Sequence, residues 1–190
     1  MRHYQEKPAK ARDGNPLDSW AYPELIWKIK PAVIGELGNR HGGTALATGH
    51  LLDHLGPGKV LAVDINHDQL PDVVRTFPRI VLITGDTCGS FEEVRQHRIP
   101  GVKALVIEGN PHTYQNTLDL MRAYGPLVSA GSYTIVEDSS GHHDRDEGFS
   151  LVPYEVLETS LSETRSFEVD RSRKPFMITE NPMRFFKKVW

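Results

Sequence analysis

The stretch that decides the fold is "VIGELGNRHGGTALATGHLL", residues 33–52. It begins with apolar residues typical of a strand, breaks at glycines and continues in a pattern typical of a helix. A strand, a glycine-rich turn and a helix in this order form the loop that holds a nucleotide in many α/β sheets. The turn lacks the dinucleotide spacing G-x-G-x-x-G, and Glu36 stands two residues before its first glycine, Gly38. The sequence therefore raises the question of which ligand this loop holds.

The same alternation of strand and helix patterns continues along the chain. Nearly continuous apolar runs are typical of strands that are buried on both faces of a parallel sheet. The predicted strands are 32–37, 59–65, 79–85, 102–108 and 132–138, and the predicted helices are 17–30, 43–55, 68–76, 90–98, 113–124 and 153–163. We therefore predict an open α/β fold with a mostly parallel sheet.

The end of the chain differs from this alternation. "SFEVDRS" (166–172) and "PFMITENP" (175–182) are two strand-like runs separated by a short turn, which predicts an antiparallel C-terminal hairpin. We expect one domain over residues 17–190, preceded by an N-terminal arm of residues 1–16.

The bulk composition excludes several classes of protein. The 190 residues are 38% apolar and 25% charged, and the net charge is -3, which is typical of a soluble globular domain and not of a general nucleic-acid or membrane binder. Cys88 is the single cysteine, so no intrachain disulfide forms, and we interpret it as a packing residue. No window reaches the roughly 20 apolar residues of a membrane span, and the polar start has no apolar signal core. We expect a cytoplasmic protein without nucleic-acid or membrane partners.

Acidic residues stand at the end of every predicted parallel strand. Because the carboxyl ends of parallel strands meet at one edge, where ligands bind in open α/β sheets, these acids are expected to lie together. They are Glu36, Asp64, Asp86, Glu108 and the pair Glu137 and Asp138. We interpret this edge as the functional site.

The first two acids favour S-adenosylmethionine over NAD. The charge of Glu36 would oppose a pyrophosphate but suits the amino group of a methionine moiety, and Asp64 can accept hydrogen bonds from ribose hydroxyls. Asp86 is expected to meet the adenine amino group. The alternative is that Glu36 caps backbone N–H groups and Asp64 caps the next helix. The predicted cofactor-binding residues are Glu36, Gly38, Asn39, His41, Gly42, Gly43, Asp64, Ile65, Asp86 and Thr87.

A resemblance to a known family rests on five stretches that occur in order over residues 16–182. They are "PLDSWAYPELIWKIKPAVIGELGNRHGGTALA", "VLAVDIN", "ITGDT", "ALVIEGNPHTYQNTLDLMRAYGPLVSAGSYTIVED" and "FEVDRSRKPFMITENP". Together they resemble the class I S-adenosylmethionine-dependent methyltransferases and, more narrowly, the cephalosporin hydroxylase and rhamnosyl O-methyltransferase family. The resemblance implies a Rossmann-like sheet with a reversed last strand and a methyl donor in the first loop.

The resemblance also implies a divalent cation, Mg²⁺, held here by Glu108, Glu137 and Asp138. Relatives tend to carry a second acid after the fourth strand, whereas this chain has Gly109 there, so Glu108 or Asn110 supplies the oxygen ligand. Such a cation would lower the pKa of an acceptor hydroxyl. The alternative is that Glu137 and Asp138 cap the loop beyond their strand.

Methyl transfer to a hydroxyl requires removal of a proton. His112, beside the expected cation, is our first general base, and with Glu108 it makes up the predicted catalytic pair; the alternative is a histidine that only packs at a helix N-terminus. We predict an O-methyltransferase that acts on a hydroxyl of a sugar or another small natural product.

Two other functions stay open. "HHD" at 142–144 contains the first part of a two-histidine, one-carboxylate iron site of an oxygenase, but no histidine follows His143. Gly109 keeps open a degenerate protein that binds the cofactor without turnover. Trp20, Trp27 and the tail "RFFKKVW" (184–190) either form the interface of a homo-oligomer or pack inward.

Overall fold

The computed structural model describes residues 16–98, 100–110, 113–137, 165–173 and 185–190, together with helical residues 156, 158–159 and 161–163. Within these residues, no helix combines the length and the apolar character that a membrane crossing requires.

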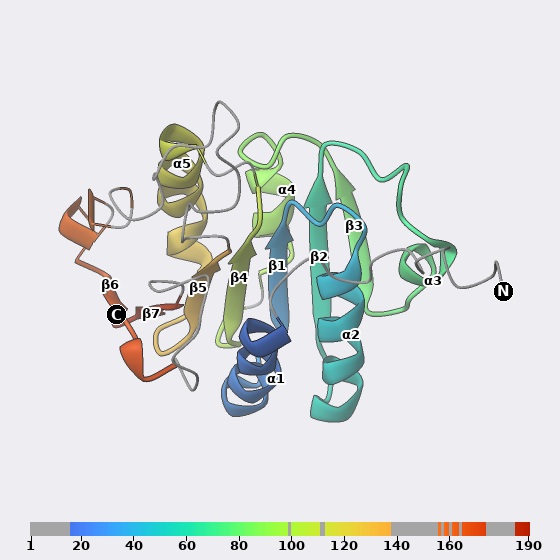
Figure 1. Cartoon of the computed structure of the whole chain (residues 1–190), viewed down its shortest axis with the longest axis horizontal. Helices are drawn as coiled ribbons and strands as arrows, with labels where there is room; N and C mark the ends of the chain where they lie inside the picture. The colour runs from blue at the N-terminus through green and yellow to red at the C-terminus, as the bar shows by residue number, and fades with distance from the viewer. Residues whose placement is uncertain are drawn as a thin grey trace, which may run out of the picture.

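A seven-stranded sheet forms the centre of the molecule, with strand order β3-β2-β1-β4-β5-β7-β6 (Figure 1). The first five strands are parallel, and β7 is antiparallel to both β5 and β6. Their bounds are β1 Val33–Leu37, β2 Lys59–Asp64, β3 Ile80–Thr84, β4 Ala104–Glu108, β5 Tyr133–Val136, β6 Phe167–Val169 and β7 Phe185–Lys188. The predicted Rossmann-like α/β fold with a mostly parallel sheet is confirmed.

Helices cover both faces of this sheet. Side chains of α1 and α2 pack with one set of strand residues, and side chains of α4 and α5 pack with the alternate set. The helix bounds are α1 Pro16–Ile29, α2 Gly43–Leu55, α3 Asp72–Arg75, α4 Phe91–Gln96 and α5 Tyr114–Tyr124, with the 3₁₀ turns η1 Gly125–Leu127 and η2 Arg171–Arg173. The period-2 alternation of strands explains the two layers, since neighbouring residues such as Ala62 and Val63 enter opposite clusters.

The predicted elements match these bounds with one exception among the described helices. The helix expected over 68–76 is confined to α3, because Pro71 disfavours helical backbone at Leu70 and becomes the N-cap of a shorter helix. For the helix expected over 153–163, the described residues 156, 158–159 and 161–163 are helical, and Val156 is buried against Leu118.

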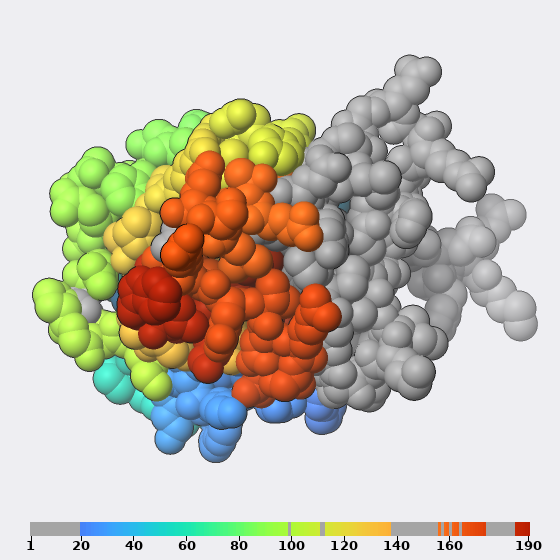
Figure 2. Space-filling view, turned by 90° about the vertical axis from the view of Figure 1, so that its left-hand side faces the viewer, coloured from blue at the N-terminus to red at the C-terminus, as the bar shows by residue number. Residues whose placement is uncertain are grey.

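The predicted antiparallel end of the sheet is confirmed by β6, which lies where it was expected and pairs with β7. The second strand expected over 175–182 lies outside the described residues and stays a prediction. Burial stabilises β7 as a strand of the sheet, because Phe185 and Phe186 are buried on opposite faces of the sheet. In Figure 2, β6, η2 and β7, in orange and red, form the face toward the viewer above the blue residues of α1.

The aromatic residues proposed for an interface divide into two groups. The phenylalanines of the tail pack inward, as one of the two alternatives held, whereas Trp20, Trp27 and Trp190 expose 68%, 58% and 67% of their surface. An interface between copies of the chain at these tryptophans stays a prediction.

Candidate functional site

Backbone hydrogen bonds join the loops at the carboxyl edge of the parallel strands. The amide of Gly38 donates to the carbonyl of Val63 at 2.8 Å, and the amide of Gly109 donates to that of Leu37 at 2.8 Å. The amide of Glu137 likewise donates to the carbonyl of Glu108 at 2.9 Å. The loop after β1 therefore lies between the loops after β2 and β4. This is the switch point of the sheet, where open α/β folds bind ligands.

The loop after β1 requires glycine at two positions. Gly38 and Gly42 have φ angles of 80° and 71°, which are left-handed conformations that favour glycine. A Cβ atom at Gly38 would lie 2.8 Å from the carbonyl oxygen of Gly109, and one at Gly42 would lie 2.6 Å from Cγ1 of Val74. Gly42 is also the N-cap of α2 and provides no side-chain acceptor for the first N–H groups of that helix. The loop is thus a backbone cradle that leads into a helix N-terminus.

Glu36 is a buried carboxylate within β1. It is 4% exposed, and its neighbours in register are Ala62 of β2 and Ile107 of β4. By the alternation of the strand it shares a face with Ile34, which packs in the cluster that contains α1 and α2. In such surroundings a carboxylate interacts with a cationic group much more strongly than it would in water. The burial of Glu36 therefore favours a ligand with a positive group.

Asp64 ties the end of β2 to the loop after β1. Its Oδ2 atom accepts a hydrogen bond from the amide of Arg40 at 2.8 Å, and its Oδ1 atom accepts one from the amide of Asn66 at 3.5 Å. Asp64 therefore caps loop amides and not the next helix, which begins at Asp72, so the alternative role for Asp64 was wrong. Each carboxylate oxygen has a second lone pair, so this bonding leaves capacity for a ribose hydroxyl.

Asn39 is the clearest sign that the loop meets a ligand. Its side chain is 5% exposed, and neither its Oδ1 nor its Nδ2 atom has a hydrogen-bond partner among the described residues. Buried amide groups are normally paired, because an unpaired one retains its desolvation cost. A polar ligand in the loop would supply the missing partners.

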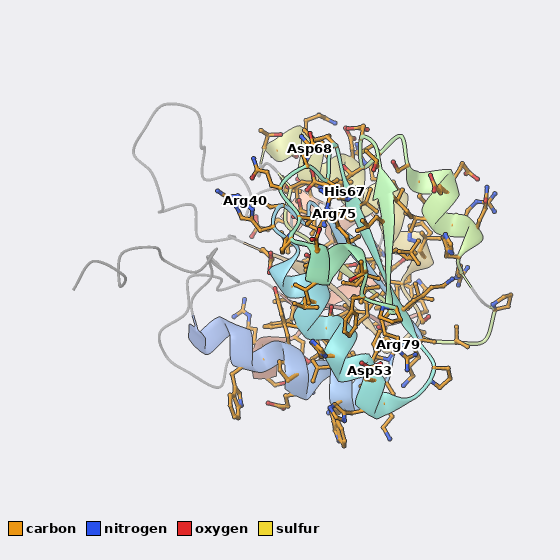
Figure 3. All side chains as sticks on the ribbon, turned by 90° about the vertical axis from the view of Figure 1, so that its right-hand side faces the viewer. Arg40, Asp53, His67, Asp68, Arg75 and Arg79 are labelled. Carbon is orange, nitrogen blue, oxygen red and sulfur yellow. The ribbon has the colours of Figure 1, made fainter. Side chains whose placement is uncertain are left out.

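His67 is a site residue to which sequence reasoning assigned no role. It is 6% exposed, its Nδ1 atom shares a hydrogen bond with Oγ1 of Thr84 at 2.8 Å, and its Nε2 atom has no partner in the part of the chain that is described. Burial lowers the pKa of His67, and the charge of Arg75 lowers it further while that of Asp64 raises it. Figure 3 shows His67 close to Arg75, whose guanidinium donates to the backbone oxygens of His67 and Leu70. In the sequence, the one signal for a role of His67 in the site was its position three residues after Asp64, the acid at the end of β2.

The residues after β3 are held by a turn. Oδ1 of Asp86 accepts a hydrogen bond from the amide of Gly89 at 2.9 Å, and Asp86 remains exposed. Thr87 is 4% exposed, and its carbonyl accepts a hydrogen bond from the hydroxyl of Tyr124. Burial raises the pKa of the Cys88 thiol, with the charges of Asp86 and Asp119 adding to the effect. A protonated thiol fits the interpretation of Cys88 as a packing residue.

The other predicted cofactor residues differ in exposure. Ile65, next to Asp64, is 71% exposed and presents an apolar side chain beside the edge. His41 is half-buried in the loop, and Gly43 begins α2.

Two of the three predicted cation ligands lie on adjacent strand ends. Glu108 is 1% exposed, and its Oε1 atom accepts a hydrogen bond from the amide of Asn110 at 3.3 Å. Glu137 is half-buried, and its Oε1 atom accepts a hydrogen bond from the hydroxyl of Tyr22. A Cβ atom at Gly109 would lie 3.0 Å from Oε2 of Glu137, so a side chain there would require the Glu137 carboxylate to shift slightly.

The remaining predicted polar residues lie outside the described residues: His112, Asp138, His142, His143 and Asp144. Among residues that the structure does describe, no three His, Cys, Asp or Glu side chains gather into a metal-binding group. The pair of Glu108 and Glu137 offers carboxylate oxygens, which are the donors that Mg²⁺ prefers.

Comparison with known proteins identifies relatives over nearly the whole chain. The family model described as Rhamnosyl O-methyltransferase/CmcI matches residues 14–189. The chain is 35% identical over 147 residues to a rhamnosyl O-methyltransferase of Mycobacterium leprae (strain TN), an alignment that covers 74% of this chain and 63% of the relative. The chain thus spans less than two thirds of the length of this relative.

Solved structures share the fold. The structure described as "cmcI-D160 Mg-SAM" superposes with a TM-score of 0.71 at 20% identity, over 93% of this chain and 73% of that chain. MycE methyltransferase from the mycinamycin biosynthetic pathway, in complex with Mg, SAH and mycinamycin VI, superposes with a TM-score of 0.59 at 18% identity, over 88% of this chain and 48% of that chain. At these identities, the likeness supports the fold alone.

Proposed function

The chain belongs to the rhamnosyl O-methyltransferase/CmcI family of class I methyltransferases, and from this premise we propose that it transfers a methyl group from S-adenosylmethionine to a hydroxyl of a sugar or another small molecule. The observation that carries the proposal is the buried carboxylate of Glu36 beside a glycine cradle at the switch point of the sheet.

The methionine end of the cofactor is assigned to the loop after β1. Its ammonium group suits the carboxylate of Glu36, and its carboxylate suits the N–H groups at the start of α2. The amide of Asn39 would find there the partners that it lacks among the described residues. Gly38, Gly42 and Gly43 would allow close approach to the backbone, and His41 would contact the cofactor from the same loop.

The adenosine end is assigned to the loops after β2 and β3. Asp64 would accept hydrogen bonds from the ribose hydroxyls while it holds the amide of Arg40. The exposed side chain of Ile65 offers an apolar surface for the face of the adenine ring. Asp86 and Thr87 would meet the adenine amino group.

The reaction forms a bond between the acceptor oxygen and the methyl carbon and breaks the bond between that carbon and the sulfonium sulfur. The products are the methyl ether and S-adenosylhomocysteine, and the hydroxyl proton goes to a base. We assign this proton to His112, which follows β4 in the sequence. Buried Glu108 would align the acceptor hydroxyl.

The proposal also includes a divalent cation at the carboxyl edge of the sheet. Glu108, Glu137 and Asp138 would hold it, supported by the adjacent strand ends of the two glutamates and by their oxygen donors. When bound, Mg²⁺ would lower the pKa of the acceptor hydroxyl. Glu137 would keep its orientation through the hydroxyl of Tyr22.

The acceptor class rests on the relatives. One is named a rhamnosyl O-methyltransferase, and a structural neighbour is in complex with mycinamycin VI, so a hydroxyl of a deoxysugar or of a glycosylated natural product is the acceptor we propose.

Isothermal titration with S-adenosylhomocysteine and with NAD tests the cofactor assignment. We expect the chain to bind the methyl-donor product and not NAD, and Glu36→Gln to weaken that binding by about tenfold or more. Glu93→Gln, which removes a carboxylate from the exposed surface of α4, is the matched control and should bind as the unaltered chain does. Binding of NAD alone would overturn the proposal.

Formation of S-adenosylhomocysteine in the presence of rhamnosides and other hydroxylated acceptors then tests turnover. Tight cofactor binding without turnover on any acceptor would favour a degenerate binding protein over the methyltransferase.

A further inference from the structure

The loop after β3 folds as a tight turn beside the end of β2. The amide of Gly85 donates to the carbonyl of Asp64 at 2.8 Å, and that of Ser90 donates to the carbonyl of Asp86 at 2.8 Å. Asp86 and Thr87 in this turn are the residues that we assign to the adenine amino group. The geometry of the adenine contact therefore depends on how firmly this loop is held.

The carbonyl of Thr87 has no donor from the backbone. In a continuous α-helical turn it would accept a hydrogen bond from the amide of Phe91, four residues on. That amide donates instead to the carbonyl of Cys88, at 3.4 Å, and no other backbone amide of the described residues donates to Thr87. Thr87 is 4% exposed, and a buried carbonyl without a donor costs free energy. A donor from another part of the fold is therefore required.

Tyr124, the last residue of α5, supplies this donor. Its hydroxyl donates to the carbonyl of Thr87, which is 37 residues away in the sequence. Its ring packs edge-on against that of Phe91, with 5.5 Å between the ring centroids and 89° between the ring planes. Phe91 begins α4, directly after the loop. One side chain thus contacts both the middle of the loop and the first residue of the helix that follows it.

The ring and the hydroxyl of Tyr124 have separate roles. The side chain is 1% exposed, and its ring belongs to the apolar cluster on the face of the sheet that α4 and α5 cover. A phenylalanine ring would fill the same space, so packing alone does not require the hydroxyl. Burial raises the pKa of Tyr124, and Cys88 and Asp86 add to the effect, so the hydroxyl keeps its proton and remains a donor. What the hydroxyl adds is a fixed position for the peptide group of Thr87.

On the basis of the proposed function, we propose that Tyr124 is a positioning residue that gives the cofactor site its preference for adenine over other bases. Thr87 directly follows Asp86, so an anchored Thr87 carbonyl limits the positions that the Asp86 carboxylate can take. The amide of Gly89 uses one lone pair of Oδ1 of Asp86 at 2.9 Å, and the other lone pairs can accept from the adenine amino group. Such a hydrogen bond discriminates between bases only when its acceptor is held in place. Tyr124 acts through the loop and not by contact with the cofactor, because it is buried.

Isothermal titration with two ligands tests this role. S-adenosylhomocysteine carries the adenine amino group, and S-inosylhomocysteine carries in its place a carbonyl oxygen, which a carboxylate repels. We expect the unaltered chain to bind the adenine ligand about tenfold or more tightly than the inosine ligand. In Tyr124→Phe we expect a loss of about tenfold for the adenine ligand and little change for the inosine ligand, so that the preference nearly disappears.

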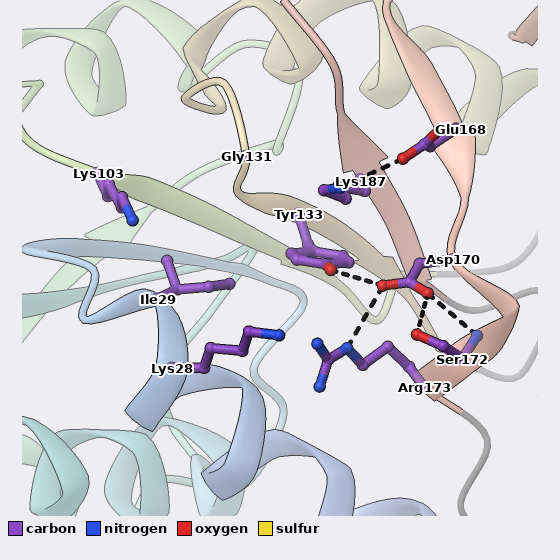
Figure 4. A pocket seen from close by; sticks show the side chains of 10 residues that line it. All are labelled: Lys28, Ile29, Lys103, Gly131, Tyr133, Glu168, Asp170, Ser172, Arg173 and Lys187. Atoms are coloured by element: carbon purple, nitrogen blue, oxygen red, sulfur yellow. Dashed lines mark hydrogen bonds and ion pairs between the residues drawn. The ribbon is translucent and has the colours of Figure 1, made fainter.

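Tyr133→Phe is the matched control. Tyr133 is 4% exposed, and its hydroxyl belongs to the Asp170 network, which consists of the hydrogen bonds that Asp170 forms with Tyr133, Ser172 and Arg173 (Figure 4). Because Tyr133 begins β5, this variant removes a buried hydroxyl at the amino ends of the parallel strands, away from the loop after β3. Its affinities for both ligands should equal those of the unaltered chain.

Four outcomes would overturn this role of Tyr124. They are equal binding of the two ligands by the unaltered chain, an unchanged preference for adenine in Tyr124→Phe, an equal loss of affinity for both ligands, and loss of the fold, which circular dichroism detects. The last two would mean that the hydroxyl stabilises the fold and not the adenine contact. The proposed function stands in all four cases as long as the unaltered chain binds S-adenosylhomocysteine. If the unaltered chain does not bind it, the proposed function is overturned, and the role of Tyr124 with it.

Discussion

Tyr22 donates a hydrogen bond from its hydroxyl to Oε1 of Glu137, although 115 residues separate them in the sequence. Tyr22 is 2% exposed on α1, and Glu137 follows β5 at the carboxyl edge of the sheet. The first described helix therefore reaches the proposed catalytic edge and fixes the orientation of one of its carboxylates.

Tyr22→Phe removes this hydrogen bond and keeps the aromatic ring. We expect the free energy of unfolding to fall by about 1.5–3 kcal/mol, the usual range for a hydrogen bond to a charged group. We also expect kcat of methyl transfer to fall roughly tenfold without a change in the affinity for S-adenosylhomocysteine, because Glu137 loses its orientation and the cofactor loop does not. Urea denaturation, enzyme kinetics and calorimetry measure the three quantities.

Tyr133→Phe is the control for this variant. It removes a tyrosine hydroxyl that donates to Oδ2 of Asp170 at 2.6 Å, at the start of β5 and so at the opposite end of that strand from Glu137. It should lower stability by about 1.5–3 kcal/mol and leave kcat unchanged. If both variants had equal kcat values, Tyr22 would have only a structural role.

Gly38→Ala tests the backbone cradle. The new Cβ would lie 2.8 Å from the carbonyl oxygen of Gly109 at a φ of 80°, so the loop would have to move. We expect a loss of about 1–3 kcal/mol in the free energy of unfolding and a fall of tenfold or more in the affinity for S-adenosylhomocysteine. Chemical denaturation and calorimetry provide these values.

Gly35→Ala provides the comparison within β1. A Cβ atom there would meet Cγ2 of Val106 at 3.8 Å, an ordinary contact, so cofactor affinity should not change. Unaltered cofactor binding in Gly38→Ala would show that the loop is not a cradle for the ligand.

Acid titration tests the Asp170 network. Burial raises the pKa of Asp170, but hydrogen bonds from Ser172 and Tyr133 and the charge of Arg173 outweigh it and lower the pKa to about 2. Since the folded pKa lies below the unfolded value of 3.8, the stabilisation is present above about pH 4 and is lost as the pH falls toward 2. Asp170→Asn should therefore lower the free energy of unfolding at pH 7 by about 2 kcal/mol, with a smaller difference at pH 3.

Urea denaturation between pH 7 and pH 3 measures this difference. Glu93→Gln, on the exposed surface of α4, should give a difference from the unaltered chain that stays near zero over the whole range. A constant deficit in Asp170→Asn at every pH would mean that packing, and not ionisation, accounts for the contribution of Asp170.

The sequence predicted the sheet because its parallel strands are buried on both faces and thus appear as continuous apolar runs. The same pattern placed the acids at one edge, since the carboxyl ends of parallel strands coincide. The sequence did not predict β7, because this strand is short and half of it is lysine, so Phe185 and Phe186 resembled a tail. Their burial depends on contacts with distant elements, which leave no local pattern.

Contacts between distant residues also limited the prediction of the site. No spacing in the sequence links Tyr22 to Glu137 or His67 to Thr84, because these pairs meet only when the sheet and its helices are assembled. The surroundings of Gly109 were likewise hidden, since its neighbours Glu137 and Gly38 come from distant parts of the sequence.

Asn39→Leu separates stability from ligand binding. The buried amide of Asn39 has no hydrogen-bond partner among the described residues, and a leucine of similar volume carries no such desolvation cost. We expect the free energy of unfolding without ligand to rise by roughly 1 kcal/mol, while the affinity for S-adenosylhomocysteine falls by tenfold or more. Asn116→Leu on α5, away from the loop, should leave the affinity unchanged. If Asn39→Leu were less stable and still bound S-adenosylhomocysteine normally, the amide of Asn39 would stabilise the fold and would not bind the cofactor. An amide whose hydrogen-bond partner is the cofactor must show the opposite pair of effects.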